Sequence, residues 1–224
     1  KMSIKIALKK NPNDKLVKNI VLFCDENFKI GGLNKLEISN QSNLINKTSD
    51  LYKSKNKNFL LFNINPSQKI ILIKVKDIKS TIENERLGAK FYTFIKSNQI
   101  NNSYFFEENI KNFLSKNKSY FSEFTHGLEL KSYIFDKYKS KKKGEMFEIN
   151  ISSKNNFLNA NKNKRYESLV EGVNFTKDLV SEPGNILHPD EYTNRLKKLS
   201  KYGLKVVVYD KNKLKKLGMN ALLG

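Results

Sequence analysis

Four carboxylates are the side chains best suited to chemistry by their type and spacing. Asp178, Glu182, Asp190 and Glu191 lie within fourteen positions of one another. A hard divalent cation needs several oxygen ligands that converge on one point, so a metal site is one interpretation. The other is structural, because acids in the first turn of a helix stabilise its positive end. We favour the structural interpretation and assign no catalytic, metal-binding or cofactor-binding residue to this chain.

The two histidines and the single cysteine indicate no reactive centre. His126 and His188 have no histidine or cysteine neighbour at a spacing typical of transition-metal ligands. Cys24 ends an apolar run and is expected to be a small buried side chain rather than a nucleophile. One cysteine cannot form an internal disulfide, which is in keeping with the reducing cytoplasm. We therefore expect a cytoplasmic protein.

The charge of the chain is strongly basic, with a formal net value of +20. Such a charge commonly indicates nucleic acid or an anionic surface as a partner. However, only Arg86, Arg165 and Arg195 are arginines, and specific recognition of bases and phosphates favours the arginine fork. Lysines spread along the whole chain instead predict a solvated basic surface.

Two stretches could contact phosphate groups. Gly31-Gly32 with Lys35 lacks the Lys-Ser/Thr pair of a phosphate-binding loop and is expected to be a turn. Residues Tyr133–Lys143 combine aromatic and basic side chains, as single-stranded nucleic-acid sites do. The alternative is a helix with aromatics that pack inward and lysines that extend to solvent. We favour the helix and keep nucleic acid as the alternative partner.

The elements that position these residues follow an α/β pattern. Hydrophobic residues make up 38% of the chain and aromatics 11%, which argues against disorder, and the longest apolar runs of four residues are too short for a membrane span. Strands are predicted at Ile4–Leu8, Ile20–Cys24, Phe59–Asn63, Lys69–Val75, Tyr104–Phe106 and Glu145–Ile151. Because Ile70–Ile73 is a continuous apolar run, we expect it in the sheet interior with both faces covered.

Two helices are predicted in the first part of the chain. Ser80 and Glu83 form a capping box that begins one of them. Its apolar face holds Leu87, Phe91, Phe94 and Ile95. The second is predicted from Ser119 to Tyr138, with Gly144 able to stop its continuation. Its buried face is expected to hold Phe121, Phe124, Leu128 and Phe135.

The last third of the chain predicts a helix, a turn, a second helix, a strand and a short helix. Residues 152–164 are polar and form a boundary. The helix that follows is marked by Tyr166, Leu169, Val170, Val173 and Val180, and Pro183-Gly184 ends it. Pro189 begins another helix, which is expected to bury Tyr192, Leu196 and Leu199 and to end at Gly203. Leu204–Tyr209 predicts a strand, Asp210 the cap of a short helix, and Gly218 its end.

This last third resembles a known enzyme family. The resemblance rests on Asp178-Leu179-Val180, Glu182-Pro183, Asn185, Pro189, Leu217-Gly218-Met219 and Ala221–Gly224. It is to the leucyl aminopeptidases, the cytosol aminopeptidase family, at the entry to their catalytic domain. A weaker match is Gly127–Ser140, which is similar to a helix late in their N-terminal domain. Ser181 and His188 stand where the family usually has asparagine and threonine, and neither change touches a catalytic position.

The resemblance implies an α/β fold with a three-layer, macro-domain-like N-terminal domain over residues 1–152. A linker and linker helix would follow at 153–181, and 182–224 would be the incomplete start of the peptidase catalytic domain. It also implies a peptide substrate, a homo-hexamer, and two divalent ions, Mn, Zn or Mg, held by residues beyond the Leu-Gly-Met segment. We therefore expect the 224-residue chain to be inactive alone. The alternative is a basic nucleic-acid-binding or oligomerisation module without enzymatic activity.

Overall fold

The computed structural model describes residues 4–9, 17–52, 57–76, 78–140, 146–152 and 160–223. Its contacts divide the chain into two units, Lys1–Asn174 and Phe175–Gly224. Helix α5, Ala160–Ser181, runs through this division. The predicted boundary at 152–164 lies partly outside the described residues, and its last five residues are helical.

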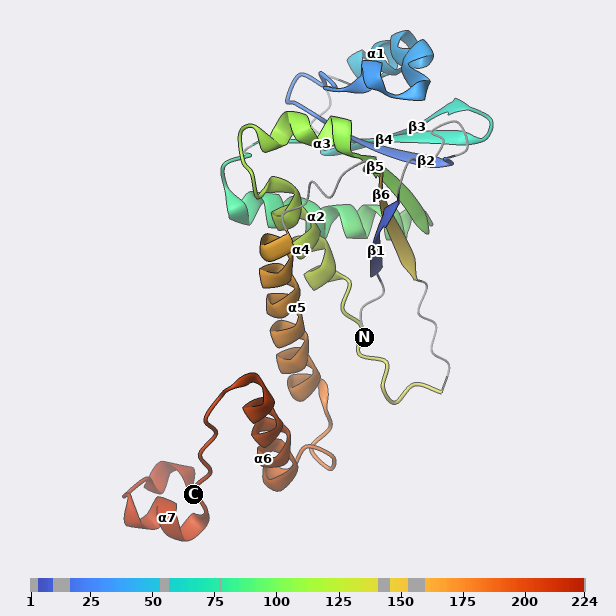
Figure 1. The fold of residues 1–224 in the computed structure, drawn as a ribbon. Coiled ribbons are helices and arrows are strands. Elements are labelled where there is room, and N and C mark those ends of the chain that lie inside the picture. Colours follow the sequence, from blue (N-terminus) through green and yellow to red (C-terminus); the bar gives the residue numbers. More distant parts are fainter. Residues whose placement is uncertain are drawn as a thin grey trace. The chain divides into compact units, whose positions relative to one another are not determined.

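The first unit is built on one mixed sheet of six strands (Figure 1). The strands are β1 Ile4–Lys9, β2 Asn19–Cys24, β3 Phe59–Asn65, β4 Gln68–Lys74, β5 Asn102–Phe106 and β6 Phe147–Ser152. Their order across the sheet is β1-β6-β5-β2-β4-β3, and every neighbouring pair is parallel except β3 with β4. Each strand predicted in this unit is therefore confirmed, with ends that differ by one or two residues.

Helices cover both faces of the sheet, which gives the three-layer α/β fold that was expected (Figure 1). On one face lie α2 Thr81–Ser97, α3 Glu107–Leu114 and α4 Tyr120–Lys131. On the other lie the 3-10 turns Leu33–Lys35 and Glu37–Gln41 and helix α1 Ser42–Asp50. Ile70–Ile73 is fully buried between the two layers, as its continuous apolar pattern predicts.

Helix α2 begins as the capping signal predicts. The Ser80 side chain accepts a hydrogen bond from the Glu83 amide at 3.3 Å. The Glu83 carboxylate, however, binds Arg86 at 2.7 Å. Of the predicted apolar face, Phe91 and Ile95 are fully buried, and the other two side chains are partly buried against the same core.

Helix α4 is shorter than predicted, because it ends at Lys131 rather than at Tyr138. Ser132 is fully buried and closes the helix: its amide donates to the carbonyls of Leu128 and Glu129, and its hydroxyl donates to Glu129. Phe135 consequently lies outside the helix, and its ring contacts that of Tyr138. The helical interpretation of Tyr133–Lys143 is thus wrong as far as residue 140, and Lys141–Gly144 lie outside the described residues.

The second unit contains helices α6 Pro189–Lys197 and α7 Lys211–Lys216 and two 3-10 turns, Lys198–Tyr202 and Asn220–Leu222. Pro189 occupies the first turn of α6, as predicted, and Gly203 ends the turn that follows at a φ of 83°. The Asp210 carboxylate caps α7 by accepting from the Lys213 amide at 2.7 Å. Gly218 ends that helix at a φ of 69°, so these start and stop signals are confirmed.

Two predictions for the second unit are wrong. Leu204–Tyr209 is not a strand, because none of the described strands pairs with it and its backbone is irregular. A strand depends on a neighbour for its hydrogen bonds. Helix α6 also has no fully buried residue, and Tyr192 is 43% exposed. No helix among the described residues combines the length and apolar composition needed to cross a membrane.

Candidate functional site

Two of the four candidate acids make ion pairs, and a third lies in the first turn of a helix. Glu182 and Glu191 both bind Arg195, each at 2.8 Å, and the Glu182 side chain is only 1% exposed. Asp190 lies in the first turn of α6, where the helix dipole favours a negative charge. The hydrogen bond from Arg195 lowers the pKa of Glu191. These contacts fit the structural interpretation of the acids.

The described ranges hold no group of three or more His, Cys, Asp or Glu side chains that could bind a metal ion. Two of the four acids are already bound to a guanidinium, and Asp178 has an interaction of its own. A dinuclear centre needs several free carboxylates around each ion. The donors in the described part of the chain therefore do not fit a two-metal site.

The histidines lie in separate places, as their sequence positions predict. His126 is buried, and its Nδ1 lies 2.8 Å from the Glu85 carboxylate. Its ring lies 4.8 Å from that of Tyr166. His188 is exposed at the start of α6 and makes no side-chain cap. A contact between His126 and Glu85 gave no signal in the sequence, since the two residues are 41 positions apart.

Cys24 is fully buried at the end of β2, as predicted. Burial, with a further contribution from Asp25, raises the pKa of its thiol to about 12. Its Sγ donates to the carbonyl of Ile73 at 3.5 Å. Since the thiolate is the nucleophile, a thiol with so high a pKa is inert at neutral pH.

Gly31-Gly32 forms a turn, as predicted. Gly32 has a φ of 77°, which only glycine adopts easily, and it precedes the turn Leu33–Lys35. A Cβ on Gly32 would lie 2.5 Å from the carbonyl oxygen of Glu108. Lys35 is bound to the Glu108 carboxylate at 3.2 Å. The glycines therefore allow close packing against α3.

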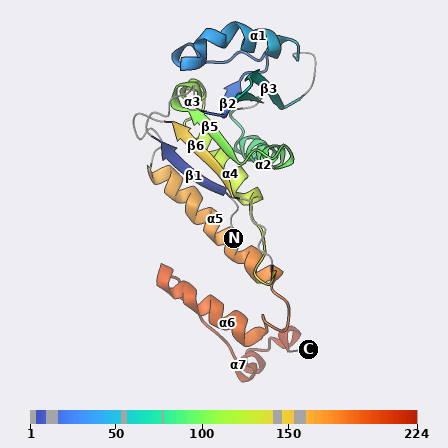
Figure 2. The ribbon, with the colours of Figure 1, turned by 90° about the vertical axis from the view of Figure 1, so that its right-hand side faces the viewer.

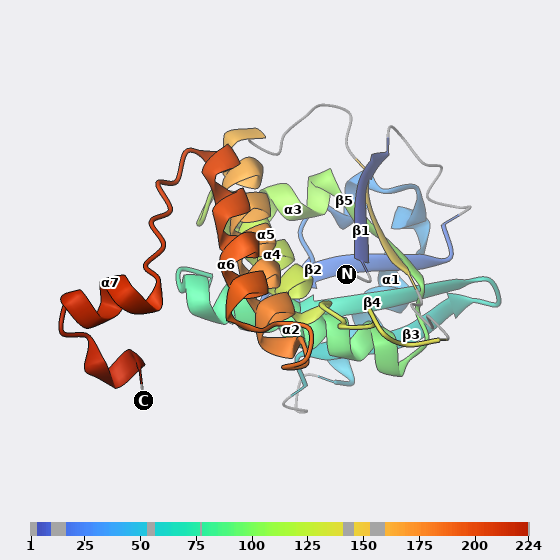
Figure 3. The ribbon, with the colours of Figure 1, turned by 90° about the horizontal axis from the view of Figure 1, so that it is seen from below.

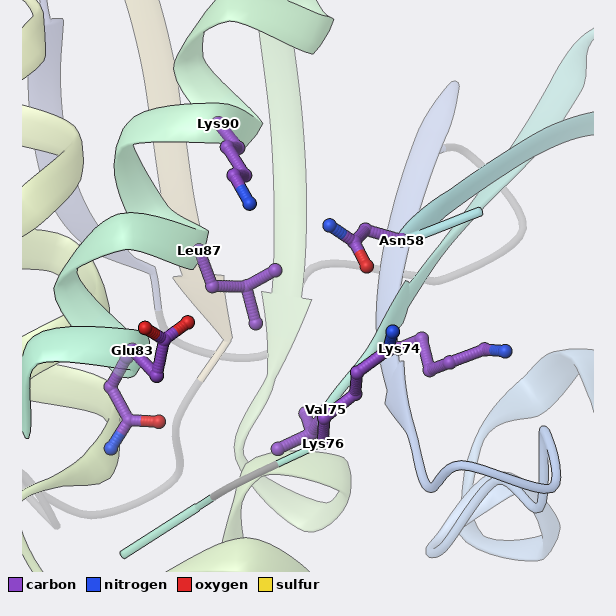
Figure 4. Close-up of a pocket in the computed structure, with 8 residues that line it drawn as sticks. Asn58, Lys74, Val75, Lys76, Glu83, Leu87 and Lys90 are labelled. Carbon is purple, nitrogen blue, oxygen red and sulfur yellow. The ribbon is translucent and has the colours of Figure 1, made fainter. Parts of the chain in front are cut away.

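A small polar pocket of about 170 Å³ lies where β4 ends and α2 begins. Figure 4 shows Lys90, Asn58 and Glu83 directed toward a common space beside Leu87. The amine of Lys74 points away from that space and lies 4.3 Å from the centre of the Phe28 ring. Its polar lining consists of lysines, asparagines and Glu83, so it could hold a small polar molecule. Sequence analysis missed it, because nothing distinguishes Lys90 from the other lysines.

A buried polar network joins α4 to the start of α2, the helix that lines this pocket. The carboxylate of Glu123, on α4, accepts hydrogen bonds from Thr81 at 3.1 Å, Asn84 at 2.8 Å and Asn117 at 3.0 Å. Glu123 is only 5% exposed. A buried carboxylate is stable when such donors satisfy it, so the network fixes α4 against the start of α2.

Among known proteins, a family resembles the C-terminal part of this chain. Residues 174–224 match the profile described as the cytosol aminopeptidase family, catalytic domain. A probable cytosol aminopeptidase of Phytoplasma mali is 47% identical over 106 residues, which are 45% of this chain and 21% of that protein. One from Methylorubrum extorquens is 36% identical over 107 residues, 46% of this chain and 21% of that protein. The matched region thus spans about a fifth of these relatives.

Solved structures extend the similarity of fold to nearly the whole chain. A mutant tomato leucine aminopeptidase superposes with a TM-score of 0.68 and 19% identity, over 96% of this chain and 46% of that one. The bottromycin maturation enzyme BotP in complex with Mn gives a TM-score of 0.59 and 12% identity, over 90% and 40%. The sequence matches thus make the chain similar to the cytosol aminopeptidase family, and the solved structures show that it shares the fold of a leucine aminopeptidase.

Proposed function

We propose that this chain is the N-terminal part of a leucyl aminopeptidase, a two-metal exopeptidase that releases N-terminal amino acids from peptides. The observation that carries the proposal is the catalytic-domain match, which begins at residue 174. That position coincides with the division between the two units, at Asn174 and Phe175. The match thus begins within the proposed linker helix, close to where the first unit, with its own three-layer core, ends.

The proposed domain division follows from the same resemblance. Residues 1–152 form the N-terminal domain, 153–181 the linker and linker helix, and 182–224 the start of the catalytic domain. The end of β6 at Ser152 and the end of α5 at Ser181 support these limits.

The proposal places the metal ligands outside these 224 residues. Its support is that Glu182 and Glu191 are engaged with Arg195 and that the relatives are much longer than the matched region. When bound, a pair of Mn, Zn or Mg ions would activate a water and polarise the scissile carbonyl. The manganese complex of BotP is a fold relative with such an ion. The 224-residue chain would be inactive by itself.

The remaining parts of the proposal concern assembly and location. A peptide substrate, a homo-hexamer and a cytoplasmic location come from the family resemblance, and the relatives' name, cytosol aminopeptidase, supports the location. Light scattering on the longer polypeptide would measure the hexamer directly.

The test is an aminopeptidase assay on two polypeptides. One is the 224-residue chain, and the other continues along the reading frame beyond Gly224. The longer polypeptide should release leucine from a leucyl peptide only when Mn²⁺, Zn²⁺ or Mg²⁺ is present, and the shorter one should not. Metal-dependent release by the shorter chain would overturn the proposed inactivity, and a longer frame without activity in any of the three metals would overturn the proposed enzyme.

One observation favours the alternative, nucleic-acid binding. The segment that follows α4 is not helical, and Tyr138 is 52% exposed, with the amine of Lys137 lying 5.4 Å from the centre of its ring. An exposed aromatic ring beside lysines can stack on a base. Titration with single-stranded and duplex DNA at two salt concentrations tests this function, and binding that Tyr138→Ala leaves unchanged would exclude this site.

A further inference from the structure

The small pocket at the start of α2 lies at the carboxyl edge of the sheet. Strand β4 runs parallel to β2, and the pocket is lined by its last residue, Lys74, and by Val75 and Lys76, which follow it. In open α/β sheets, ligands commonly bind outside the carboxyl ends of the strands. The position of this pocket therefore favours a ligand site.

The fold holds the two sides of this pocket in place. Helix α2 packs along the half of the sheet that contains β3 and β4 (Figures 2 and 3), and the rings of Phe59 and Phe94 stack with their centroids 5.0 Å apart. The Lys74 amide donates to the Asn58 carbonyl at 2.8 Å, which keeps Asn58 beside the end of β4. The Asn58 side chain consequently faces α2 across the pocket (Figure 4).

Three residues of α2 form the other side of the pocket. Glu83, Leu87 and Lys90 recur at intervals of four and three positions, which places them on one side of the helix. Figure 4 shows the Glu83 carboxylate and the Lys90 amine directed, from the two ends of this row, toward the space beside Leu87. The row therefore presents a negative group, an apolar side chain and a positive group in that order.

The two charged groups of the row leave each other unsatisfied. Glu83 and Lys90 are about two helical turns apart, and Lys90 has no carboxylate partner among the described residues. Glu83 binds Arg86, but the two side chains are 49% and 65% exposed, so this surface ion pair is weak. A carboxylate accepts several hydrogen bonds, so Glu83 can accept from a second donor.

The other lysines of the lining leave this pattern of charge unchanged. The amine of Lys74 is turned away from the space and lies over the Phe28 ring, and Lys76 has an interaction of its own. A simple anion in the pocket would be repelled by the Glu83 carboxylate, and a simple cation by the Lys90 amine. A ligand that carries both charges is complementary to both groups.

We propose that this pocket binds a free α-amino acid as a zwitterion. The ligand's carboxylate accepts hydrogen bonds from the Lys90 amine and the Asn58 amide, and its ammonium group donates to the Glu83 carboxylate. Its side chain lies against Leu87 and Val75. The volume of about 170 Å³ suits a small apolar amino acid such as valine, since a cavity of about 150 Å³ holds benzene. The inference does not depend on the proposed peptidase activity, because every lining residue belongs to the first unit.

Titration of the 224-residue chain with L-valine tests the site, with the backbone amide resonances followed by two-dimensional NMR. A pocket of this size that is open to solvent implies a dissociation constant on the order of a millimolar. Valine should cause saturable shifts at residues 58, 75 and 83–90. Absence of saturable shifts there, at valine concentrations well above that constant, would overturn the proposal.

Two derivatives of valine separate the contributions of its charges. N-acetylvaline lacks the ammonium group, and valinamide lacks the carboxylate. Each should bind at least about tenfold more weakly than valine, because one charged group of the pocket loses its partner. N-acetylvaline that binds as tightly as valine would indicate a site for simple anions, and valinamide that does so would indicate a site for simple amines. Either result would overturn the zwitterion site.

Matched variants assign the two contacts. Lys90→Met and Glu83→Gln should each weaken valine binding by at least about tenfold. Lys90→Met should leave the weaker binding of valinamide unchanged, and Glu83→Gln that of N-acetylvaline, because those ligands lack the group that the replaced side chain binds. Lys96→Met, on the same helix and outside the pocket lining, should bind valine as the wild type does.

All three replaced side chains are exposed, so the variants should keep the fold. Wild-type affinity for valine in both pocket variants, or an equal loss in all three variants, would contradict the site.

Discussion

Gly88 of α2 and Gly127 of α4 each lie directly against the backbone of the opposite helix. A Cβ on Gly88 would collide with the carbonyl oxygen of Phe124, and a Cβ on Gly127 would collide with that of Glu85. The two helices therefore meet with no side chain between their backbones at this crossing. The crossing thus sets how closely α4 packs against α2.

Replacement of either glycine at the crossing should destabilise the first unit. Gly88→Ala and Gly127→Ala should each lower the free energy of unfolding by about 3 kcal/mol, because the added methyl forces two backbones apart. Chemical denaturation followed by circular dichroism measures this loss. Gly172→Ala in α5 is the control: a Cβ there meets nothing within 4 Å, so it should stabilise by about 0.5–1 kcal/mol. Equal effects at the three glycines would contradict the close crossing.

Ser80 and Glu83 have different roles at the start of α2. Ser80→Ala should cost about 1 kcal/mol of unfolding free energy, since the Glu83 amide loses its acceptor. Glu83→Ala should cost less, because its exposed carboxylate contributes only a surface ion pair with Arg86. Thermal unfolding of the two variants under one buffer condition makes the comparison. A larger loss for Glu83→Ala would mean that a complete capping box forms in solution.

A buried amide ties the end of β2 to α3. Asn109 is 1% exposed, accepts from the Phe23 amide at 2.7 Å, and donates to the carbonyls of Phe23 and Gly31. Asn109→Ala should lower the free energy of unfolding by roughly 3 kcal/mol, since buried backbone groups lose their partners. Asn46→Ala, exposed on α1, should change it by less than about 0.5 kcal/mol. A loss at Asn109 no greater than at Asn46 would show that water replaces the amide.

Arg195 holds α6 of the second unit through two carboxylates. Arg195→Met should speed amide exchange in α6, because Glu182 and Glu191 lose their guanidinium. The pKa of Glu191 is lowered by this contact, so the contact stabilises above the ordinary carboxyl pKa and is lost as the pH falls through the lowered one. The wild type should thus lose α6 protection in acid, and Arg195→Met should not show this loss. Lys197→Met on the same helix is the control for a change of charge alone.

The sequence predicts the strands of the first unit well, because runs of β-branched and aromatic residues there favour a strand and no other element. Ile70–Ile73 can be stable only where both faces are covered, and it is fully buried in β4. The helix starts at Ser80, Pro189 and Asp210 are also predictable, since caps and prolines act locally. Termination by Gly203 and Gly218 follows from their left-handed backbone.

Predictions fail where the outcome depends on distant contacts. The end of α4 is set by the buried Ser132, whose hydroxyl gives no periodic signal. The apolar pattern of Leu204–Tyr209 predicts a strand, yet the pattern cannot supply a partner strand. In α5, Val170 is buried whereas Val180 is 82% exposed, although both fit one amphipathic pattern.

Site residues are harder to predict than elements. Contacts such as Glu85 with His126 join residues of different helices, and a pocket lined by Glu129 and Glu167 needs β1, β6, α4 and α5 in place. By contrast, the inert character of Cys24 follows from its apolar neighbours in sequence, because burial is the largest cause of its raised pKa.

The most direct test of the family assignment and its proposed chemistry is the rate at which the polypeptide extended beyond Gly224 cleaves a leucyl peptide before and after removal of divalent metal. We expect a loss of at least about a hundredfold on chelation, with recovery when Mn²⁺ or Zn²⁺ is returned. A rate that is unaffected by chelation, or an extended polypeptide that cleaves no N-terminal residue in any metal, would contradict the account.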